Sequence, residues 1–118
     1  MPGPPRARLS ELEDWVGRNR GRLAGLALTW RTGVSPALGN RPPSAWVDLE
    51  SRDALARGAV TEGICELVVT RRRDGGRTLG ERREAPTKAD VDQALDHLVE
   101  QLLAVSGTAT QDRPSGAG

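Results

Sequence analysis

The first residue of this 118-residue chain that could do chemistry is His97, its only histidine. Nucleophilic catalysis would need the imidazole beside a serine or beside Cys65, the only cysteine. The helical periodicity of the surrounding residues instead turns His97 away from the apolar side, toward water beside Asp96 and Glu100. Cys65 falls in the middle of an expected strand, where a small buried thiol usually serves packing alone. The sequence therefore predicts no catalytic residue and, with one cysteine, no thiolate metal site.

Two pairs of carboxylates have a spacing that acid–base chemistry could use: Asp48 with Glu50, and Asp90 with Asp92. The first pair lies on one face of an expected strand. The second lies in the first turn of an expected helix, where the helix dipole favours acidic residues. The glycines of residues 74–76 lead into another extended segment and not into a helix, so they lack the arrangement of a phosphate-binding loop. We expect a non-enzymatic protein that needs no cofactor and no metal.

The sharpest charged feature is an arginine-rich hairpin at residues 71–83, which could form a basic patch for nucleic acid. Its arginines are Arg71, Arg72, Arg73, Arg77, Arg82 and Arg83. Strand alternation divides them between two faces, Glu81 and Glu84 dilute their charge, and the chain has no Phe or Tyr to stack on bases. A small nucleic-acid-binding module that uses this hairpin is therefore the alternative, and a solvated sheet edge is the simpler interpretation.

Length and composition set the wider limits. A chain of 118 residues is enough for one domain with one modest core. Its formal net charge of +1 provides no field that would steer it onto nucleic acid or an anionic membrane. No run approaches the roughly 20 apolar residues of a membrane helix, and the first residues lack the apolar region of a secretory signal. Together with the single cysteine, this predicts a cytoplasmic protein without membrane contact.

The elements expected to position these residues form an α+β domain. Five segments show the alternation or composition of strands, and we expect them to pair as an antiparallel meander. They are residues 24–32, 44–50, 54–60, 64–71 and 77–85, the last charged enough to lie at a sheet edge. A loop at 33–43, with three prolines, separates the first two.

Two amphipathic helices flank the predicted sheet, and we expect both on one of its faces. The first should begin at Ser10, which has the spacing of a capping box with Glu13. The second should begin after Thr87, capped with Asp90, and end at residues 106–107. The predicted organisation is a disordered tail at 1–8, a single domain at 9–106 and a disordered tail at 107–118.

The chain has three large aromatic residues, Trp15, Trp30 and Trp46, whose usual place is the core. Trp46 is different because it shares a strand face with Asp48 and Glu50, opposite Val47. If the helices cover the Val47 face, these three residues stay on the open face as an aromatic anchor with a polar rim for a partner. If the helices cover the other face, Trp46 is core.

The three tryptophans, the segment at 43–51 (PSAWVDLES) and the segment at 62–67 (EGICEL) resemble the TriTu immunity proteins. These are small single-domain proteins encoded beside bacterial polymorphic toxins, and the resemblance covers about residues 9–105. It implies a non-enzymatic protein that binds a cognate protein toxin and occludes the toxin's active surface. A small structural or chaperone-like adaptor is a further alternative, and an adjacent toxin gene would favour the immunity protein over it.

Overall fold

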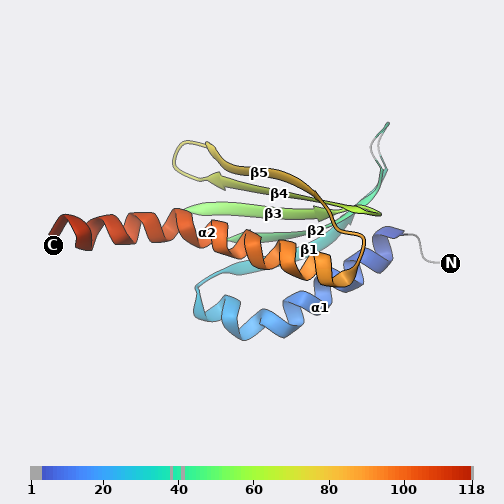
Figure 1. The fold of residues 1–118 in the computed structure, drawn as a ribbon, viewed down its shortest axis with the longest axis horizontal. Coiled ribbons are helices and arrows are strands. Elements are labelled where there is room, and N and C mark those ends of the chain that lie inside the picture. Colours follow the sequence, from blue (N-terminus) through green and yellow to red (C-terminus); the bar gives the residue numbers. More distant parts are fainter. Residues whose placement is uncertain (1–3, 38, 41, 118) are drawn as a thin grey trace.

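The computed structural model describes residues 4–37, 39–40 and 42–117, with side chains described only between residues 8 and 105. The chain forms a helix, five strands and a second helix in that order (Figure 1). The elements are α1 (Pro4–Gly25), β1 (Thr29–Ser35), β2 (Ser44–Glu50), β3 (Ala54–Val60), β4 (Ile64–Arg71), β5 (Arg77–Glu84) and α2 (Lys88–Ala117). The predicted α+β class and element order are confirmed.

The five strands form one antiparallel sheet in the order β1-β2-β3-β4-β5, which is the predicted meander. The central strands have the predicted bounds because each alternates buried and exposed side chains between two short turns. One turn is closed by the Thr61 amide, which donates to the carbonyl of Ile64. The charged strand β5 lies at an edge, as expected, and its pairing with β4 shifts register between Val69 and Thr70. Such an irregularity and such charges discourage sheets from pairing edge to edge.

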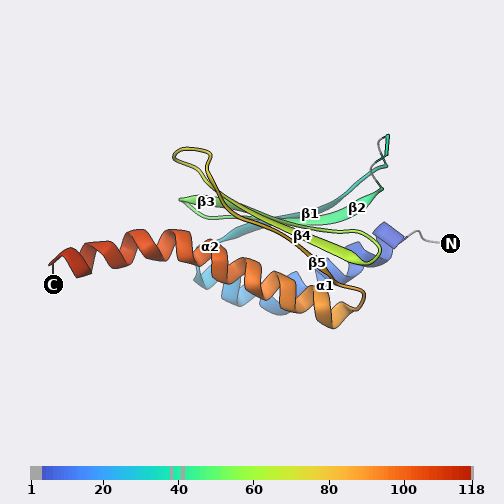
Figure 2. The same cartoon turned by 45° about the horizontal axis from the view of Figure 1, so that its top comes forward.

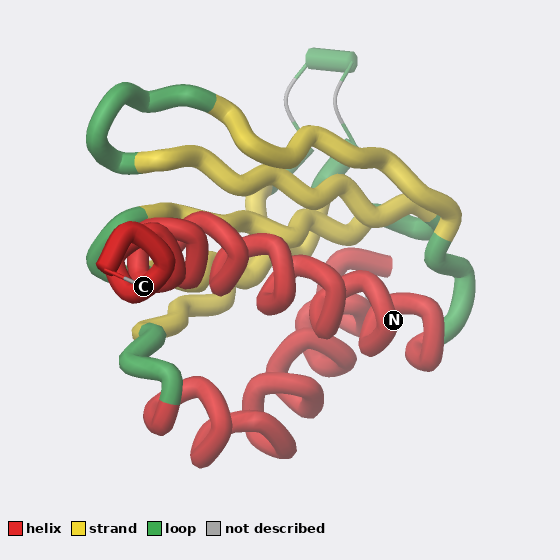
Figure 3. The backbone as a smooth tube through the Cα atoms, turned by 60° about the vertical axis from the view of Figure 1, so that its left-hand side comes forward, coloured by secondary structure: helices red, strands yellow, loops and turns green. Residues whose placement is uncertain are grey.

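Both helices lie on the same face of the sheet, as predicted (Figures 2 and 3). Helix α1 packs on β1 and β2, and α2 packs on β3 and β4. On β2, the side chains of Ala45, Val47 and Leu49 point into this interface and are fully buried. The helices therefore cover the Val47 face, and Trp46 lies on the open face.

The amphipathic pattern predicted for α2 is confirmed by burial, except that Val105 is only partly buried. Val91, Ala94, Leu95, Leu98, Val99 and Leu102 have no exposed surface. Gly58 on β3 lets this stripe approach the sheet closely, because a Cβ built there would lie 2.9 Å from Cδ2 of Leu95. Trp15 packs into the same core from α1, and Trp30 is packed partly against it.

Helix α1 begins earlier than predicted, at Pro4 and not at Ser10. Prolines suit the first turn of a helix, since that turn needs no amide donors and the proline φ is already helical. Ser10 therefore lies inside the helix and does not cap it. Arg8, expected in a disordered tail, is instead 5% exposed and bonded to two loops. The first three residues of that predicted tail lie outside the described residues.

The first strand also differs from the prediction. Residues 24–25 still belong to α1, and β1 begins at Thr29 and continues through Gly33 to Ser35, into the expected loop. The end of α1 is a Schellman motif, in which the Leu28 amide donates to the Leu23 carbonyl. Ala27 occupies the left-handed position of this motif, with a φ of 60°. The alternating apolar pattern that begins at residue 24 is typical of a strand, but the backbone of residues 24–28 forms the end of a helix.

Helix α2 ends later than predicted. It continues past residues 106–107 to Ala117 and projects beyond the end of the sheet (Figure 1). A glycine in a helix costs only about 1 kcal/mol relative to alanine, and extending an existing helix is far easier than starting one. A serine–glycine pair therefore does not oblige the helix to stop. Residue 118 lies outside the described residues.

Candidate protein-binding face

The helices leave one face of the sheet uncovered (Figure 2). This face carries a hollow of about 760 Å³. The residues on its floor and sides include Trp46, Arg57, Ala59, Glu66, Val68, Arg77 and Arg82. They come from four adjacent strands, so the hollow spans most of the width of the sheet.

Trp46 lies at one side of this hollow, and its ring is covered on both faces. One face lies on Gly33, its cross-strand partner on β1. The guanidinium carbon of Arg57 stands 4.6 Å from the ring centroid, as in a cation–π contact. Trp46 is therefore on the open face, as one of the two predicted arrangements has it, but its ring supports an arginine and is not itself the outermost group.

Asp48 holds that arginine in place. Arg57 donates from Nε to Oδ1 of Asp48 at 2.6 Å and from Nη2 to Oδ2 at 2.8 Å. These hydrogen bonds raise the pKa of Arg57. The Asp48 carboxylate, with 16% of its side chain exposed, also lies 3.7 Å from Nη2 of Arg31. Asp48 thus fixes the side chain of Arg57, whereas the sequence predicted that Asp48 would belong to a polar rim that contacts a partner.

Glu50, the third predicted partner-binding residue, lies farther along β2. It accepts a hydrogen bond of 3.0 Å from Nη2 of Arg72. Arg72 also donates from Nε to the Ser51 carbonyl. The structure therefore brings Trp46 and Asp48 together through Arg57, and it places Glu50 in a separate contact at the end of the strand.

The predicted basic patch is not one surface. Arg71 is paired with Asp74 in the β4–β5 turn at 3.1 Å, Arg73 is exposed in the same turn, and Arg83 is paired with Glu81. Only Arg77 and Arg82 line the hollow. The predicted division of these arginines between two faces is confirmed.

Arg57 is the residue that the sequence analysis missed. It was read only as part of a short strand, although it stands directly opposite Asp48 in the β2–β3 pairing. The signal was available in the hairpin: a short turn fixes the register, and the register brings an arginine against a carboxylate.

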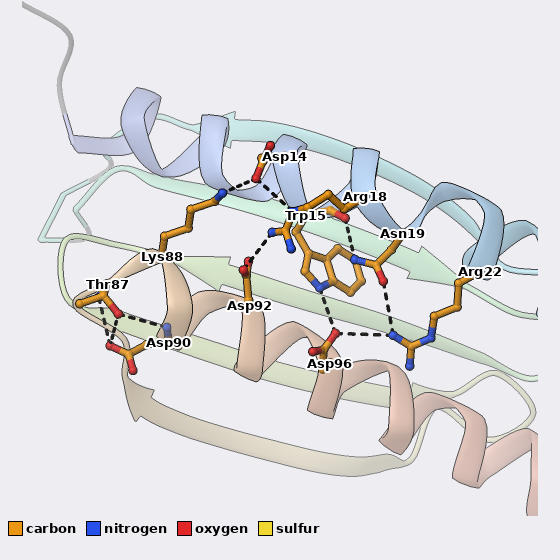
Figure 4. A network of polar contacts seen from close by, with 10 residues as sticks. All are labelled: Asp14, Trp15, Arg18, Asn19, Arg22, Thr87, Lys88, Asp90, Asp92 and Asp96. Atoms are coloured by element: carbon orange, nitrogen blue, oxygen red, sulfur yellow. Dashed lines mark hydrogen bonds and ion pairs between the residues drawn. The ribbon is translucent and has the colours of Figure 1, made fainter.

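The other polar candidates have structural contacts. The Thr87 and Asp90 side chains accept from each other's backbone amides at 3.2 and 3.1 Å, which confirms the predicted cap (Figure 4). Asp92 accepts from Arg18 of α1 at 2.9 Å, and Trp15 donates from Nε1 to Asp96 at 3.1 Å. These contacts join α1 to α2.

Lys88 and Arg18 make further contacts between α1 and α2 (Figure 4). Lys88 is paired with Asp14, and its hydrogen bond holds the pKa of that carboxyl below the usual value. Arg18 contacts Asp14 at 3.2 Å as well as the acidic side of α2. The acidic residues in the first turns of α2 thus serve helix docking.

His97 and Cys65 lie on the helix-covered side of the sheet. Nε2 of His97 is 3.5 Å from Oε1 of Glu81, and 32% of the side chain is exposed. His97 therefore faces strand β5, whereas the sequence predicted a fully solvated side chain beside Asp96 and Glu100. The expected neighbour Glu100 is present, with its Oε1 3.9 Å from Nδ1 of His97. Cys65 is fully buried, and burial raises the pKa of its thiol to about 11. A thiol with this pKa stays protonated at neutral pH and is a poor nucleophile.

No family model, curated protein or solved structure matches this chain. Among the described residues, no three His, Cys, Asp or Glu side chains are grouped as they would be around a metal ion. In that same part of the chain, neither helix is long and apolar enough to cross a membrane.

Proposed function

We propose that this chain is a non-enzymatic protein-binding domain whose uncovered sheet face docks onto a partner protein. The observation that carries the proposal is the placement of both helices on one face, with Trp46 and Arg57 left on the other. Tryptophan and arginine are the residues most enriched in the hot spots of protein interfaces. Apolar side chains beside them, from Ala59 and Val68, give the face an apolar centre within a polar surround.

The partner in this proposal is a bacterial protein toxin that the chain neutralises as an immunity protein in the cytoplasm. This part rests on the resemblance of residues 43–51 and 62–67 to the TriTu immunity proteins. The structure adds one supporting observation, since Trp46, in the first of these segments, belongs to the open face. The histidine, the cysteine and both carboxylate pairs make structural contacts, which favours binding over catalysis.

A growth-protection assay tests the proposal. The protein encoded next to this chain's gene is produced in bacteria alone, then together with the wild-type chain or with Trp46→Ala. We expect growth arrest by the neighbour alone, rescue by the wild type, and loss of rescue by Trp46→Ala, whose binding should weaken by at least about 2 kcal/mol. Arg20→Ala, an exposed change on α1, is the control and should still rescue.

Three results would contradict the proposed immunity function. A neighbour that does not arrest growth, or rescue by Trp46→Ala as complete as by the wild type, would contradict the proposal. Protection against unrelated toxins, with suppression of their aggregation, would instead indicate a chaperone-like adaptor. Circular dichroism and thermal melts of Trp46→Ala must show a folded protein, so that lost rescue reports lost binding.

Nucleic-acid binding is the second candidate, and Arg77 and Arg82 on the open face are the observation in its favour. Fluorescence anisotropy with single-stranded RNA and duplex DNA tests it at about 50 and 200 mM salt. Binding through phosphates would weaken steeply between these concentrations and would require both arginines.

A further inference from the structure

We infer that the hollow on the open face receives an acidic segment of the partner protein, whose carboxylates are bound by Arg57, Arg77 and Arg82. The inference rests on the proposed function, because it takes this face as the docking surface. It adds the chemistry of the occupant: an extended stretch with carboxylates on either side of an apolar side chain.

The first argument is that Arg57 is held ready for a ligand. Its guanidinium lies over the Trp46 ring, and two of its three nitrogens are taken by the Asp48 carboxylate. The third nitrogen, Nη1, forms no hydrogen bond within the described part of the chain. An arginine fixed in this way loses little conformational entropy on binding, and its remaining donors match a carboxylate.

The second argument is that two more arginines face the hollow without partners. Neither Arg77 nor Arg82 forms an ion pair or a side-chain hydrogen bond to any residue that the structure describes. The Arg77 side chain lies over Gly80, since a Cβ built on that glycine would be 3.0 Å from Cδ of Arg77. Elsewhere on this face arginines are paired with acidic residues, as Arg72 is with Glu50.

The third argument is the spacing between Arg57 and Arg77, whose side chain lies over Gly80. Arg57, Val68 and Gly80 stand in one cross-strand row, so the strands that carry Arg57 and Gly80 are roughly 10 Å apart. The apolar floor between them belongs to Val68. In an extended peptide, residues i, i+2 and i+4 share a face, and the outer two are about 13 Å apart. A Glu-Ser-Leu-Ser-Glu segment would thus place leucine on Val68 and bring a glutamate within reach of an arginine on either side.

Glu66 is the acidic group that opposes such a ligand. It lies on the open face, between Ala59 on β3 and Arg82 on β5 in the pairing register. Glu81, the other acidic residue that lines the hollow, is paired with Arg83. With Asp48 bound to Arg57, Arg77 and Arg82 therefore outnumber the carboxylate of Glu66. Replacing Glu66 with an uncharged residue should therefore strengthen binding of the acidic segment.

The experiment uses the capped peptide Glu-Ser-Leu-Ser-Glu as the probe and follows the three tryptophan indole N–H signals by ¹⁵N NMR. We expect a saturable shift of the Trp46 signal, identified by its loss in Trp46→Phe. The Trp15 indole, which donates to Asp96 on the opposite side of the sheet, should not shift. Peptides with glutamine or lysine in place of both glutamates are the controls and should leave the Trp46 signal unchanged.

Three variants then test the named charges, and a fourth is the control. The double variant Arg77→Gln/Arg82→Gln should weaken peptide binding at least about fivefold, a size typical of two ion pairs. Arg57→Gln should abolish the shift, and Glu66→Gln should tighten binding about twofold or more. The matched control is Arg20→Gln/Arg52→Gln, which removes the same charge from exposed positions outside the hollow and should change affinity less than twofold.

Any of four results would overturn the inference: equal binding of the glutamine peptide, equal weakening by the control variant, weaker binding by Glu66→Gln, or a larger Trp46 shift with a ten-nucleotide single-stranded RNA. The last would assign the hollow to nucleic acid. The peptide titration needs no toxin, so its failure is separate from that of the growth assay. Peptide binding without growth protection would retain the acidic ligand and contradict the immunity function.

Discussion

Trp46 lies so close to Gly33 that a Cβ built at residue 33 would stand 2.5 Å from Cζ2 of the indole. The two residues face each other in the β1–β2 pairing, and Arg57 covers the other face of the ring. A glycine within a strand usually weakens it, but here the missing side chain makes room for the indole of Trp46. The position of Arg57 thus depends on a glycine two strands away.

Gly33→Ala should therefore destabilise the fold by about 1 to 3 kcal/mol, because the indole must move off its strand and away from Arg57. Urea denaturation measures the change. Gly17→Ala is the control, since no atom lies within 4 Å of the added Cβ, and alanine should stabilise that helix by about 0.5 to 1 kcal/mol. Equal stability of Gly33→Ala and the wild type would mean that the indole does not need this contact.

Most of the fold could be predicted from local patterns. Strands β2, β3 and β4 were found with their bounds because alternation of two residues is a direct imprint of a sheet with one covered face. The phase of α2 followed from its apolar stripe, and its start followed from the Thr87 and Asp90 cap. Each of these signals lies within a few residues along the chain.

Two features that the sequence did not predict depend on contacts that are distant along the chain. Arg8 looked like part of a polar tail because its partners, Thr61 and the Ala85 carbonyl, are 53 and 77 residues away. To predict the environment of Trp46, one would need both the register of the strand pairing and the rotamer of the tryptophan side chain. Its open-face position could be stated only as one of two alternatives, because the pattern on β2 does not say which face the helices take.

Ala27→Gly should stabilise the protein by about 0.5 to 1 kcal/mol. Ala27 has a φ of 60° at the end of α1, a conformation that is strained for alanine and normal for glycine. The side chain is exposed, so the variant loses no packing. Thermal melts test the change, with Gly75→Ala as the reverse control: its φ of 69° should make alanine destabilising. A lower melting temperature for Ala27→Gly would contradict the strain.

Arg8→Ala should destabilise the protein by about 2 to 4 kcal/mol. Arg8 donates from Nε to the Thr61 carbonyl at 3.2 Å and from Nη2 to the Ala85 carbonyl, and so fixes α1 against two loops. Alanine would leave these acceptors without their donor in a buried place. Chemical denaturation measures the loss, and Arg20→Ala, exposed on the same helix, should change stability by less than about 0.5 kcal/mol.

Leu98→Ala and His97→Ala should differ sharply although they are neighbours on α2. Leu98 is fully buried against Gly58, so its truncation leaves a cavity and should cost roughly 2 to 5 kcal/mol. His97 is partly exposed, and its nearest carboxylates, on Glu81 and Glu100, are 3.5 and 3.9 Å away, so its loss should cost less than about 0.5 kcal/mol. Denaturant unfolding of both variants checks the contrast, and similar losses would mean that the helix is rotated.

Cys65 should make stability fall in alkaline solution. Burial raises the pKa of its thiol to about 11 from an ordinary value of 9.0, so the folded state keeps a proton that the unfolded state gives up sooner. This stabilisation is complete below pH 9 and is lost as the pH rises to about 11, a loss of roughly 2 to 3 kcal/mol. The chain suits the measurement because it has no tyrosine and a single lysine, Lys88. Denaturant unfolding at pH 8 to 11 should show the fall in the wild type and in Lys88→Arg, which keeps its charge throughout, whereas Cys65→Ala should show much less of it. An equal fall in Cys65→Ala would mean that another group is responsible.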